Sequence, residues 1–297
     1  MNLSFEQRRK REGFFFVLPG IIVVLAVLGY PLIYNIVLSL KNMNVRNIAT
    51  GGTFIGFKNY IDQFQSPLFR KVFMNTVVFT VFCLIFQFSI GMLLALFFNQ
   101  KSTLSGPIRG LCMVPYLMPM SVTALLFQNI FTASSGFMND LLVKLGVISN
   151  VNAIPWLTST QLAMVAVIIT NCWVGIPFNM LLLTNGLANV PQDIYESASV
   201  DGANKFQRFF LITVPMIKPA MLSVLMMGCI YTFKCFDLMY VMTSGGPQNA
   251  TDVLGTYAYQ LSFSKYEFSQ GSTVSVILFL VLFIVSLFYL RVINTED

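Results

Sequence analysis

The chain has 297 residues, of which 56% are hydrophobic and only 10% are charged. Soluble domains carry about 25% charged residues, so this composition excludes a water-soluble globular protein. The net charge of +6 comes from Lys and Arg residues scattered between apolar blocks, which is typical of a membrane protein and excludes a nucleic-acid-binding face.

Six apolar blocks are each long enough to cross a hydrocarbon layer of ~30 Å, which takes about 20 residues of helix. They cover residues 14–40, 72–98, 108–131, 162–187, 216–239 and 273–292. Backbone amides in lipid must be bonded within the span, and the alternating segments of a barrel are missing. We therefore predict an all-α membrane protein with six transmembrane helices, which form a single transmembrane domain over residues 1–297.

The first block follows a basic run, Arg8 to Arg11, and superficially resembles a signal peptide. Its apolar stretch from Phe14 to Leu40 is longer than the roughly 7–15 apolar residues of a signal peptide, and no small-residue cleavage site follows it. We predict a retained helix.

The positive charges predict the orientation of the spans, because cytoplasmic connections carry an excess of Lys and Arg. With a cytoplasmic N-terminus, that side receives Arg8, Arg9, Lys10, Arg11, Lys101, Arg109, Lys205, Arg208, Lys218 and Arg291. The outer side receives Lys41, Arg46, Lys58, Arg70, Lys71, Lys144 and Lys265. The bias favours both termini inside the cell, in agreement with an even number of spans.

Catalytic and metal-binding chemistry have little support in the sequence. The chain has no histidine, which excludes Ser/His/Asp and Cys/His catalysis and the commonest metal ligand. The five cysteines lie in apolar segments without the spacings of metal sites, and we predict reduced packing residues: Cys83, Cys112, Cys172, Cys229 and Cys235. We predict no catalytic residue, no metal site and no enzyme activity.

Two connections between the later blocks are long. Residues 132–161 would face outward and carry a short interfacial helix, and residues 190–215 would form a cytoplasmic loop. In that loop, Pro191 and the acidic residues after it suit the first turn of a helix. The small residues of 197–199 follow, and Gly202 can end the helix with a positive φ. We predict a short protruding helix with a narrow surface that a soluble partner can approach.

This loop resembles the cytoplasmic EAA motif of permease subunits of binding-protein-dependent ABC importers. The resemblance rests on Glu196-Ser197-Ala198, then Gly202, then Ile212 and Val214-Pro215, in the order and spacing of that family. Ser197 replaces the first alanine of the motif and Val214 replaces its leucine. The alternative is an ordinary amphipathic loop helix, which the matching spacing and the cytoplasmic placement disfavour.

Further short segments along nearly the whole chain are similar to the carbohydrate branch of this family, the maltose, lactose and glycerol-3-phosphate type permeases. They are Leu18-Pro19, Tyr30-Pro31, Gly56 to Tyr60, Asn75-Thr76, Pro155 to Leu157, Trp173 to Met180, Phe236 to Tyr240 and Thr243 to Pro247. The resemblance implies the type I ABC importer permease fold and transport of a sugar-like solute.

The resemblance also implies the partners. These are a second permease subunit in a heterodimer, an ABC ATPase dimer, an extracytoplasmic solute-binding protein, a carbohydrate substrate and the surrounding membrane lipid, without nucleic acid. The chain has no phosphate-binding glycine loop with Lys-Ser/Thr, so ATP and Mg would be bound and hydrolysed by the separate ATPase, and this chain would bind no cofactor. The expected location is the inner membrane of a bacterial or archaeal cell, as a multi-pass protein.

For the mechanism, the resemblance implies that residues 193–203 form a coupling helix in a groove of one ATPase subunit. Glu196 would pair with a basic residue there, and Gly202 would let the chain turn. The coupling residues are then Glu196, Ser197, Ala198, Asp201 and Gly202. ATPase closure would drive a rigid-body change between inward-open and outward-open states.

Candidate solute-binding residues are polar groups inside the spans, because such groups are costly in lipid and usually face a cavity or a partner. In the fourth span Asn171 and Gly175 are four residues apart and share a helical face. In the fifth span Tyr231, Lys234 and Asp237 follow one another at intervals of three residues, and we predict that they share a second helical face. The resemblance places the first four of these where maltose-type relatives contact sugar. Gln87, Gln128 and Asn129 are weaker candidates.

Each of these residues has a structural alternative, which stays open at this stage. Asn171 can bond a neighbouring helix, Gly175 can permit close helix packing, and Lys234 with Asp237 can form an ion pair. At the level of the whole protein, a secondary transporter or channel would also give six apolar helices. Dependence of uptake on ATP and on a soluble ATPase distinguishes that class from an ABC importer.

Overall fold

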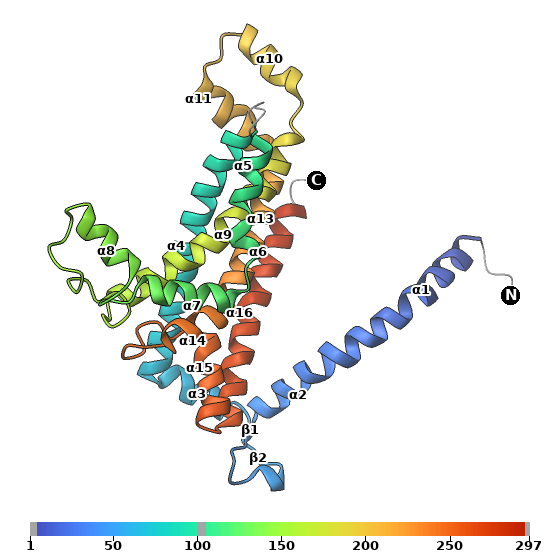
Figure 1. Cartoon of the computed structure of the whole chain (residues 1–297). Helices are drawn as coiled ribbons and strands as arrows, with labels where there is room; N and C mark the ends of the chain where they lie inside the picture. The colour runs from blue at the N-terminus through green and yellow to red at the C-terminus, as the bar shows by residue number, and fades with distance from the viewer. Residues whose placement is uncertain (1–4, 100–104, 295–297) are drawn as a thin grey trace. The chain divides into compact units, whose positions relative to one another are not determined.

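The computed structural model describes residues 5–99 and 105–294 and is helical almost throughout (Figure 1). Lys101 and the side chains of Arg8, Lys10 and Arg11, which enter the charge argument, lie outside the described residues. The chain divides into two compact units, one from Met1–Gln65 and Ala258–Ile277 and the other from Ser66–Tyr257 and Leu278–Asp297.

The first unit begins with α1 (Phe5–Val24), which continues through the π-helical turn η1 (Leu25–Gly29) into α2 (Tyr30–Ser39). A small hairpin follows, in which β1 (Lys41–Asn42) pairs antiparallel with β2 (Thr53–Phe54), and η2 (Ile48–Thr50) is a 3-10 turn between them. The unit also contains α3 (Lys58–Gln65), η4 (Gln260–Ser264) and the first turns of α16 (Phe268–Asn294).

Asn59 is the polar centre of this first unit. Its buried amide Nδ2 donates to the carbonyl oxygens of Ser39 at 2.8 Å and Lys41 at 2.7 Å. Its Oδ1 accepts from Nε2 of Gln270 at 3.0 Å, and Gln270 Oε1 accepts from Gln63 Nε2 at 2.7 Å. Asn59 therefore joins α3 to the hairpin and to α16.

The second unit is built on two long apolar helices that pack against each other, α4 (Pro67–Phe98) and α9 (Leu162–Ala188) (Figure 1). Ser66 caps α4, where its Oγ accepts from the Phe69 N–H at 3.4 Å. A Cβ on Gly91 would lie 2.7 Å from Cβ of Asn179, so the missing side chain lets the two helices approach closely. On this pair packs α13 (Lys218–Phe233).

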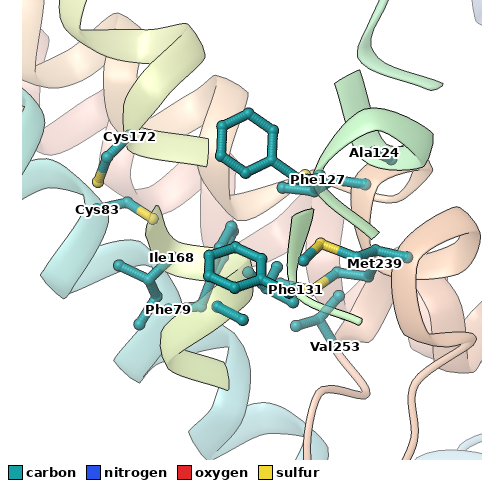
Figure 2. Packing of buried hydrophobic residues seen from close by; sticks show 14 residues of the cluster. Phe79, Cys83, Ala124, Phe127, Phe131, Ile168, Cys172, Met239 and Val253 are labelled. Atoms are coloured by element: carbon teal, nitrogen blue, oxygen red, sulfur yellow. The ribbon is translucent and has the colours of Figure 1, made fainter. Parts of the chain in front are cut away.

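Smaller helices close one end of the pair. There α14 (Asp237–Thr243) packs against α7 (Met120–Ile130) and α9, around a buried cluster that includes Phe79, Phe131 and Met239 (Figure 2). The five cysteines are free thiols, and Cys83 and Cys172 lie side by side at the edge of this cluster (Figure 2).

The connection between α7 and α9 contains α8 (Phe137–Lys144), a short helix in the loop for which one is predicted. Asn139 holds this loop together: its Nδ2 donates to the carbonyl oxygens of Ala133, Val151 and Ile154 at 2.7–3.2 Å, and its Oδ1 accepts from Trp156 Nε1 at 2.7 Å. Trp156, one of the residues of the family resemblance, therefore has a structural role here.

The predicted third span is not one helix. Residues 108–131 are divided among α5 (Ser105–Cys112), α6 (Val114–Leu117) and α7. Pro115 and Pro119 explain the breaks, because proline lacks the N–H of the helical bond and keeps the residue before it extended, as Met118 is at φ −80° and ψ 136°.

The predicted fifth span, 216–239, is interrupted as well. At its start, Lys205–Met216 and Lys218–Phe233 meet at a bend of 68°. At its end, α13 stops at Phe233 and α14 starts at Asp237, so Asp237 does not continue the helical face of Tyr231 as its spacing predicts. By length and composition, four described helices can cross a membrane, or five if the bent pair is one span. Two further short helices are α12 (Val214–Met216) and α15 (Leu254–Tyr259).

Candidate solute cavity and cytoplasmic coupling helix

A cavity of about 370 Å³ lies among α4, α6, α9 and α13 of the second unit. Three of the five predicted solute-binding residues line it, Asn171, Gly175 and Tyr231. Lys234 and Asp237 do not belong to its lining. Gln87, a weaker candidate of the sequence, does belong to it.

Amide groups form one wall of this cavity. Nε2 of Gln87 donates to the backbone oxygen of Asn171 at 3.1 Å, across the interface between α4 and α9. The Gln87 amide fills the space in which a Cβ on Gly175 would lie, so any larger residue there would have to displace this amide. Nδ2 of Asn179 donates to the Gly175 oxygen at 2.9 Å. Gln87 and Gly175 therefore act as one packed pair.

The side-chain amide of Asn171 has an unusual environment in this cavity. The residue is only 6% exposed, and its Nδ2 has no hydrogen-bond partner among the described residues. The thiol of Cys83 lies near this amide without satisfying it. Burying a donor unpaired costs about 1–3 kcal/mol, and Asn171 bears this cost in the lining of the cavity.

Aromatic rings form another part of the cavity lining. The rings of Tyr116 and Phe178 stack with centroids 5.5 Å apart, and Phe178 meets Tyr231 edge to face at 6.1 Å. Tyr116 and Phe178 are not among the predicted site residues. The signal in the sequence is the Pro115 and Pro119 pair, because a broken helix in a membrane segment usually borders a cavity.

Lys234 lies at the end of α13 beside this aromatic group. Its Nζ is 5.1 Å from the centroid of the Tyr231 ring, within the range of a cation–π interaction. Lys234 and Asp237 are both exposed and form no ion pair in the part of the chain that the structure describes. The predicted grouping of Tyr231 with Lys234 is present in space, whereas the grouping with Asp237 is not.

The other intramembrane candidates have structural partners. Nε2 of Gln128 donates to the Met242 oxygen at 3.2 Å, and Nδ2 of Asn129 donates to the Leu125 oxygen of its own helix at 2.8 Å. Trp173 packs against Phe127 with ring centroids 5.3 Å apart.

The predicted protruding helix is α10 (Gln192–Val200), and it ends in a Schellman motif. The N–H of Ala203 donates to the Ala198 oxygen at 2.9 Å and that of Gly202 to the Ser199 oxygen at 3.2 Å. Gly202 has φ +80°, and no atom lies within 4 Å of the position that a Cβ would take. Positive φ is the conformation for which glycine is preferred at this position.

The proposed coupling residues lie on the accessible surface of α10. Glu196 and Ser197 are exposed, as are Asp201 and Gly202 after the helix, and Ala198 is half-buried. Glu196 also lines a pocket of about 520 Å³ at the base of α10, together with Arg208. An exposed acid on a short helix is available to a basic partner.

Two hydrogen bonds fix α10 to the segment that follows it, α11 (Lys205–Arg208) and the π-helical turn η3 (Phe209–Thr213). The hydroxyls of Tyr195 and Thr213 are 2.8 Å apart, and Nη1 of Arg208 donates to Ser199 Oγ at 2.6 Å. Ser199 Oγ in turn donates to the Tyr195 oxygen at 2.6 Å. In Figure 1, α10 and α11 stand together beyond the ends of α4 and α9. Helix and base are thus one rigid piece.

Comparisons with known proteins agree with this architecture. Along 94% of its length, the chain is 33% identical to the sulfoquinovosyl glycerol transport system permease protein SmoG of Agrobacterium fabrum, of which it covers 89%. It is 31% identical to the trehalose/maltose transport system permease protein MalF of Thermococcus litoralis, over 98% of this chain and 97% of that protein.

The fold is similar to that of a chain in the crystal structure of a bacterial alginate ABC transporter in complex with an alginate pentasaccharide-bound periplasmic protein. The TM-score is 0.81 at 23% sequence identity, with 97% of this chain and 96% of that chain covered, and this likeness concerns the fold alone. It confirms the predicted all-α fold of ABC importer permeases.

The family described as "Binding-protein-dependent transport system inner membrane component" matches residues 87–295, a range that contains both the cavity and α10. The match decides between the two classes that the sequence leaves open, in favour of the ABC importer and against a secondary transporter or channel. It also makes the chain a transport component and not an enzyme. The chain belongs to the family of inner membrane components of binding-protein-dependent transport systems.

Proposed function

We propose that this chain forms half of the translocation pathway of an ATP-driven importer of a carbohydrate. The observation that carries the proposal is the buried, unpaired amide of Asn171 in a cavity that also has an aromatic side, in a chain whose relatives include sugar permeases. Hydroxyl groups need such donors, and the apolar faces of a sugar ring suit the exposed ring of Tyr231.

In this proposal Asn171, Gly175 and Tyr231 contact the solute directly. Lys234 lies at the edge of the site, where it orients the Tyr231 ring and reaches a solute that extends from the cavity. Asp237 is the least supported of the five proposed solute-binding residues. It is the first residue of α14 and does not line the cavity.

Coupling to ATP hydrolysis runs through α10. Glu196 pairs with a basic residue of an ATPase subunit, Ser197 and Ala198 keep the contact surface narrow, and Asp201 and Gly202 form the turn that ends it. The exposure of Glu196 and the rigid fixation of α10 support this role. ATP and Mg are bound by the ATPase, and this chain binds no cofactor.

The assembly that we propose has two different permease subunits, an ABC ATPase dimer and an extracytoplasmic solute-binding protein. This subunit has six spans with both termini in the cytoplasm of a bacterial or archaeal cell. The broken segment α5–α7 supplies the third span and the bent segment before α13 enters the fifth. The loop of residues 190–215 then lies on the cytoplasmic side.

The test is reconstitution of the complete transporter in proteoliposomes, with ATPase activity measured against a panel of saccharides. We expect one class of saccharide to stimulate hydrolysis in the presence of the binding protein. Glu196→Lys should abolish this stimulation, whereas Asp140→Lys, a charge reversal on α8, should leave it intact. Full solute-stimulated hydrolysis by Glu196→Lys would contradict the coupling role, and stimulation by no saccharide would contradict the solute class.

A further inference from the structure

A third and larger cavity of the second unit adjoins the pocket at the base of α10, with which it shares Tyr195 and Arg208. It is an open groove of about 940 Å³ between α4 and the segment α11–η3. Apolar side chains line most of it: Phe88, Met92, Leu93, Leu96, Phe206 and Phe209. None of the solute-cavity residues takes part in it.

Polar groups also line this groove, on the segments that follow α9 and at the C-terminal end of α4. Lys205 and Arg208 line it there, beside Asn99, Tyr195 and Thr213. None of the described residues that line it is acidic. Lys205 is exposed, and Arg208 uses Nη1 to hold Ser199 while its guanidinium borders the groove. The groove therefore has an apolar body and a cationic end.

The length of the apolar body matches one leaflet of a bilayer. From Phe88 to Asn99 the helix α4 advances 11 residues, which is about 16 Å at a rise of 1.5 Å per residue. Half of a hydrocarbon core of ~30 Å is about 15 Å. Because α4 is an apolar helix long enough to span, a bilayer around it would place the cationic end of the groove at headgroup level.

We infer that this groove binds one anionic phospholipid. An acyl chain lies along α4 against Leu93 and Leu96, and the phosphate is held by Lys205 and Arg208. Leu93 is 67% exposed and Phe206 78% exposed, as expected of side chains that complete their packing with an external apolar molecule. Two cations in a lining without a described carboxylate select an anionic headgroup over a zwitterionic one.

The inference needs only that α4 spans the membrane, so it is independent of the solute and of the coupling role of α10. Arg208 and Tyr195 contribute both to the groove and to the fixation of α10. A bound lipid would therefore sit directly against the base of that helix, which is the physical reason why anionic lipid should affect the stability of this region.

The experiment uses the transporter purified with its partner subunits and exposed to phosphatidylglycerol or phosphatidylcholine, with native mass spectrometry to count retained lipid. We expect retention of phosphatidylglycerol and not of phosphatidylcholine. Lys205→Gln should weaken retention about fivefold, since one basic side chain near a membrane surface contributes about 1 kcal/mol. Leu93→Trp should block the acyl-chain position.

Matched controls lie elsewhere on the surface: Arg109→Gln removes a cation from α5, and Leu117→Trp enlarges an exposed leucine of α6 outside the groove. Both should retain phosphatidylglycerol as the unaltered chain does. Equal retention of both lipids, or unchanged retention in Lys205→Gln, overturns the inference. So does retention of the lipid by the permease subunits alone but not by the complete transporter, which would show that an ATPase subunit occupies the groove. Solute-stimulated hydrolysis, measured in the same preparations, tests the proposed function separately.

Discussion

The amide of Gln87 occupies the space that a side chain on Gly175 would need, while its Nε2 donates to the backbone of Asn171. The glycine is therefore part of the shape of the solute cavity and not only a site of close helix packing. Close packing, the structural interpretation that the sequence allows for Gly175, is present, and Gln87, which packs against it, also lines the cavity.

Gly175→Ala should displace Gln87 and break its hydrogen bond to Asn171. We expect a loss of stability of about 1–3 kcal/mol, the usual cost of overpacking, together with weaker solute-stimulated ATPase activity. Thermal unfolding and hydrolysis assays measure the two effects. Gly110→Ala is the control, since nothing lies within 4 Å of its Cβ position.

The double variant Gln87→Ala/Gly175→Ala distinguishes overlap from a general effect of alanine in α9. It gives the new methyl group room, so part of the lost stability should return. If the double variant is as unstable as the sum of the two single variants, the two residues do not act as a pair.

Asn171→Leu should separate stability from function. The substitution removes a buried donor that has no described partner, so the free energy of unfolding should stay constant or rise by up to about 1 kcal/mol. Solute affinity should fall because the donor to a solute hydroxyl is lost. Thr184→Val on the same helix is the control, since that hydroxyl bonds the Met180 carbonyl of its own helix. Unchanged solute affinity would remove Asn171 from the site.

Gly202→Ala should impair coupling. A Cβ at φ +80° costs about 1–2 kcal/mol, which frays the end of α10 and displaces Glu196. We expect solute-stimulated hydrolysis to fall severalfold, and Gly202→Asn to retain more of it because asparagine tolerates this conformation. Gly146→Ala imposes the same strain at φ +72° after α8. Equal losses in both alanine variants would show a general folding defect in place of a coupling defect.

Tyr195→Phe and Thr213→Val should have similar effects on coupling, because each removes one hydroxyl of the pair that fixes α10 to η3. The ratio of solute transported to ATP hydrolysed is the readout. In a double-mutant cycle the second substitution should add little to the first. Fully additive losses would show that the two hydroxyls act separately.

Some of this architecture follows from the sequence and some does not. The structure has a helix over Leu162–Ala188, where the apolar pattern predicts a span over residues 162–187. The pattern succeeds here because the segment is apolar without a break and Pro177 lies inside the helix without ending it. The family resemblance is confirmed, since its motifs are local in the chain and need no knowledge of contacts.

The prediction of one continuous helix over residues 108–131 and that of a helical face shared by Tyr231 and Asp237 are wrong for a common reason. Hydropathy does not register a break in the backbone, so Pro115, Pro119 and the non-helical residues 234–236 count as parts of apolar blocks. The sequence places Gln87 too low among the candidates for another reason: its neighbours Asn171 and Gly175 are on a different helix, and a single sequence does not show which helices touch.

The 68° bend between Lys205–Met216 and Lys218–Phe233 gives this part of the chain the shape of a bent lever with a short and a long arm. Under the proposed coupling role, a push on α10 would act on the short arm, to which α10 is hydrogen-bonded, and would turn it about the buried Ile217 at the bend. The long arm from Lys218 to Tyr231 covers 13 residues, or about 20 Å. Under that role, a rotation of a few degrees at Ile217 would displace the Tyr231 ring at the far end of the long arm.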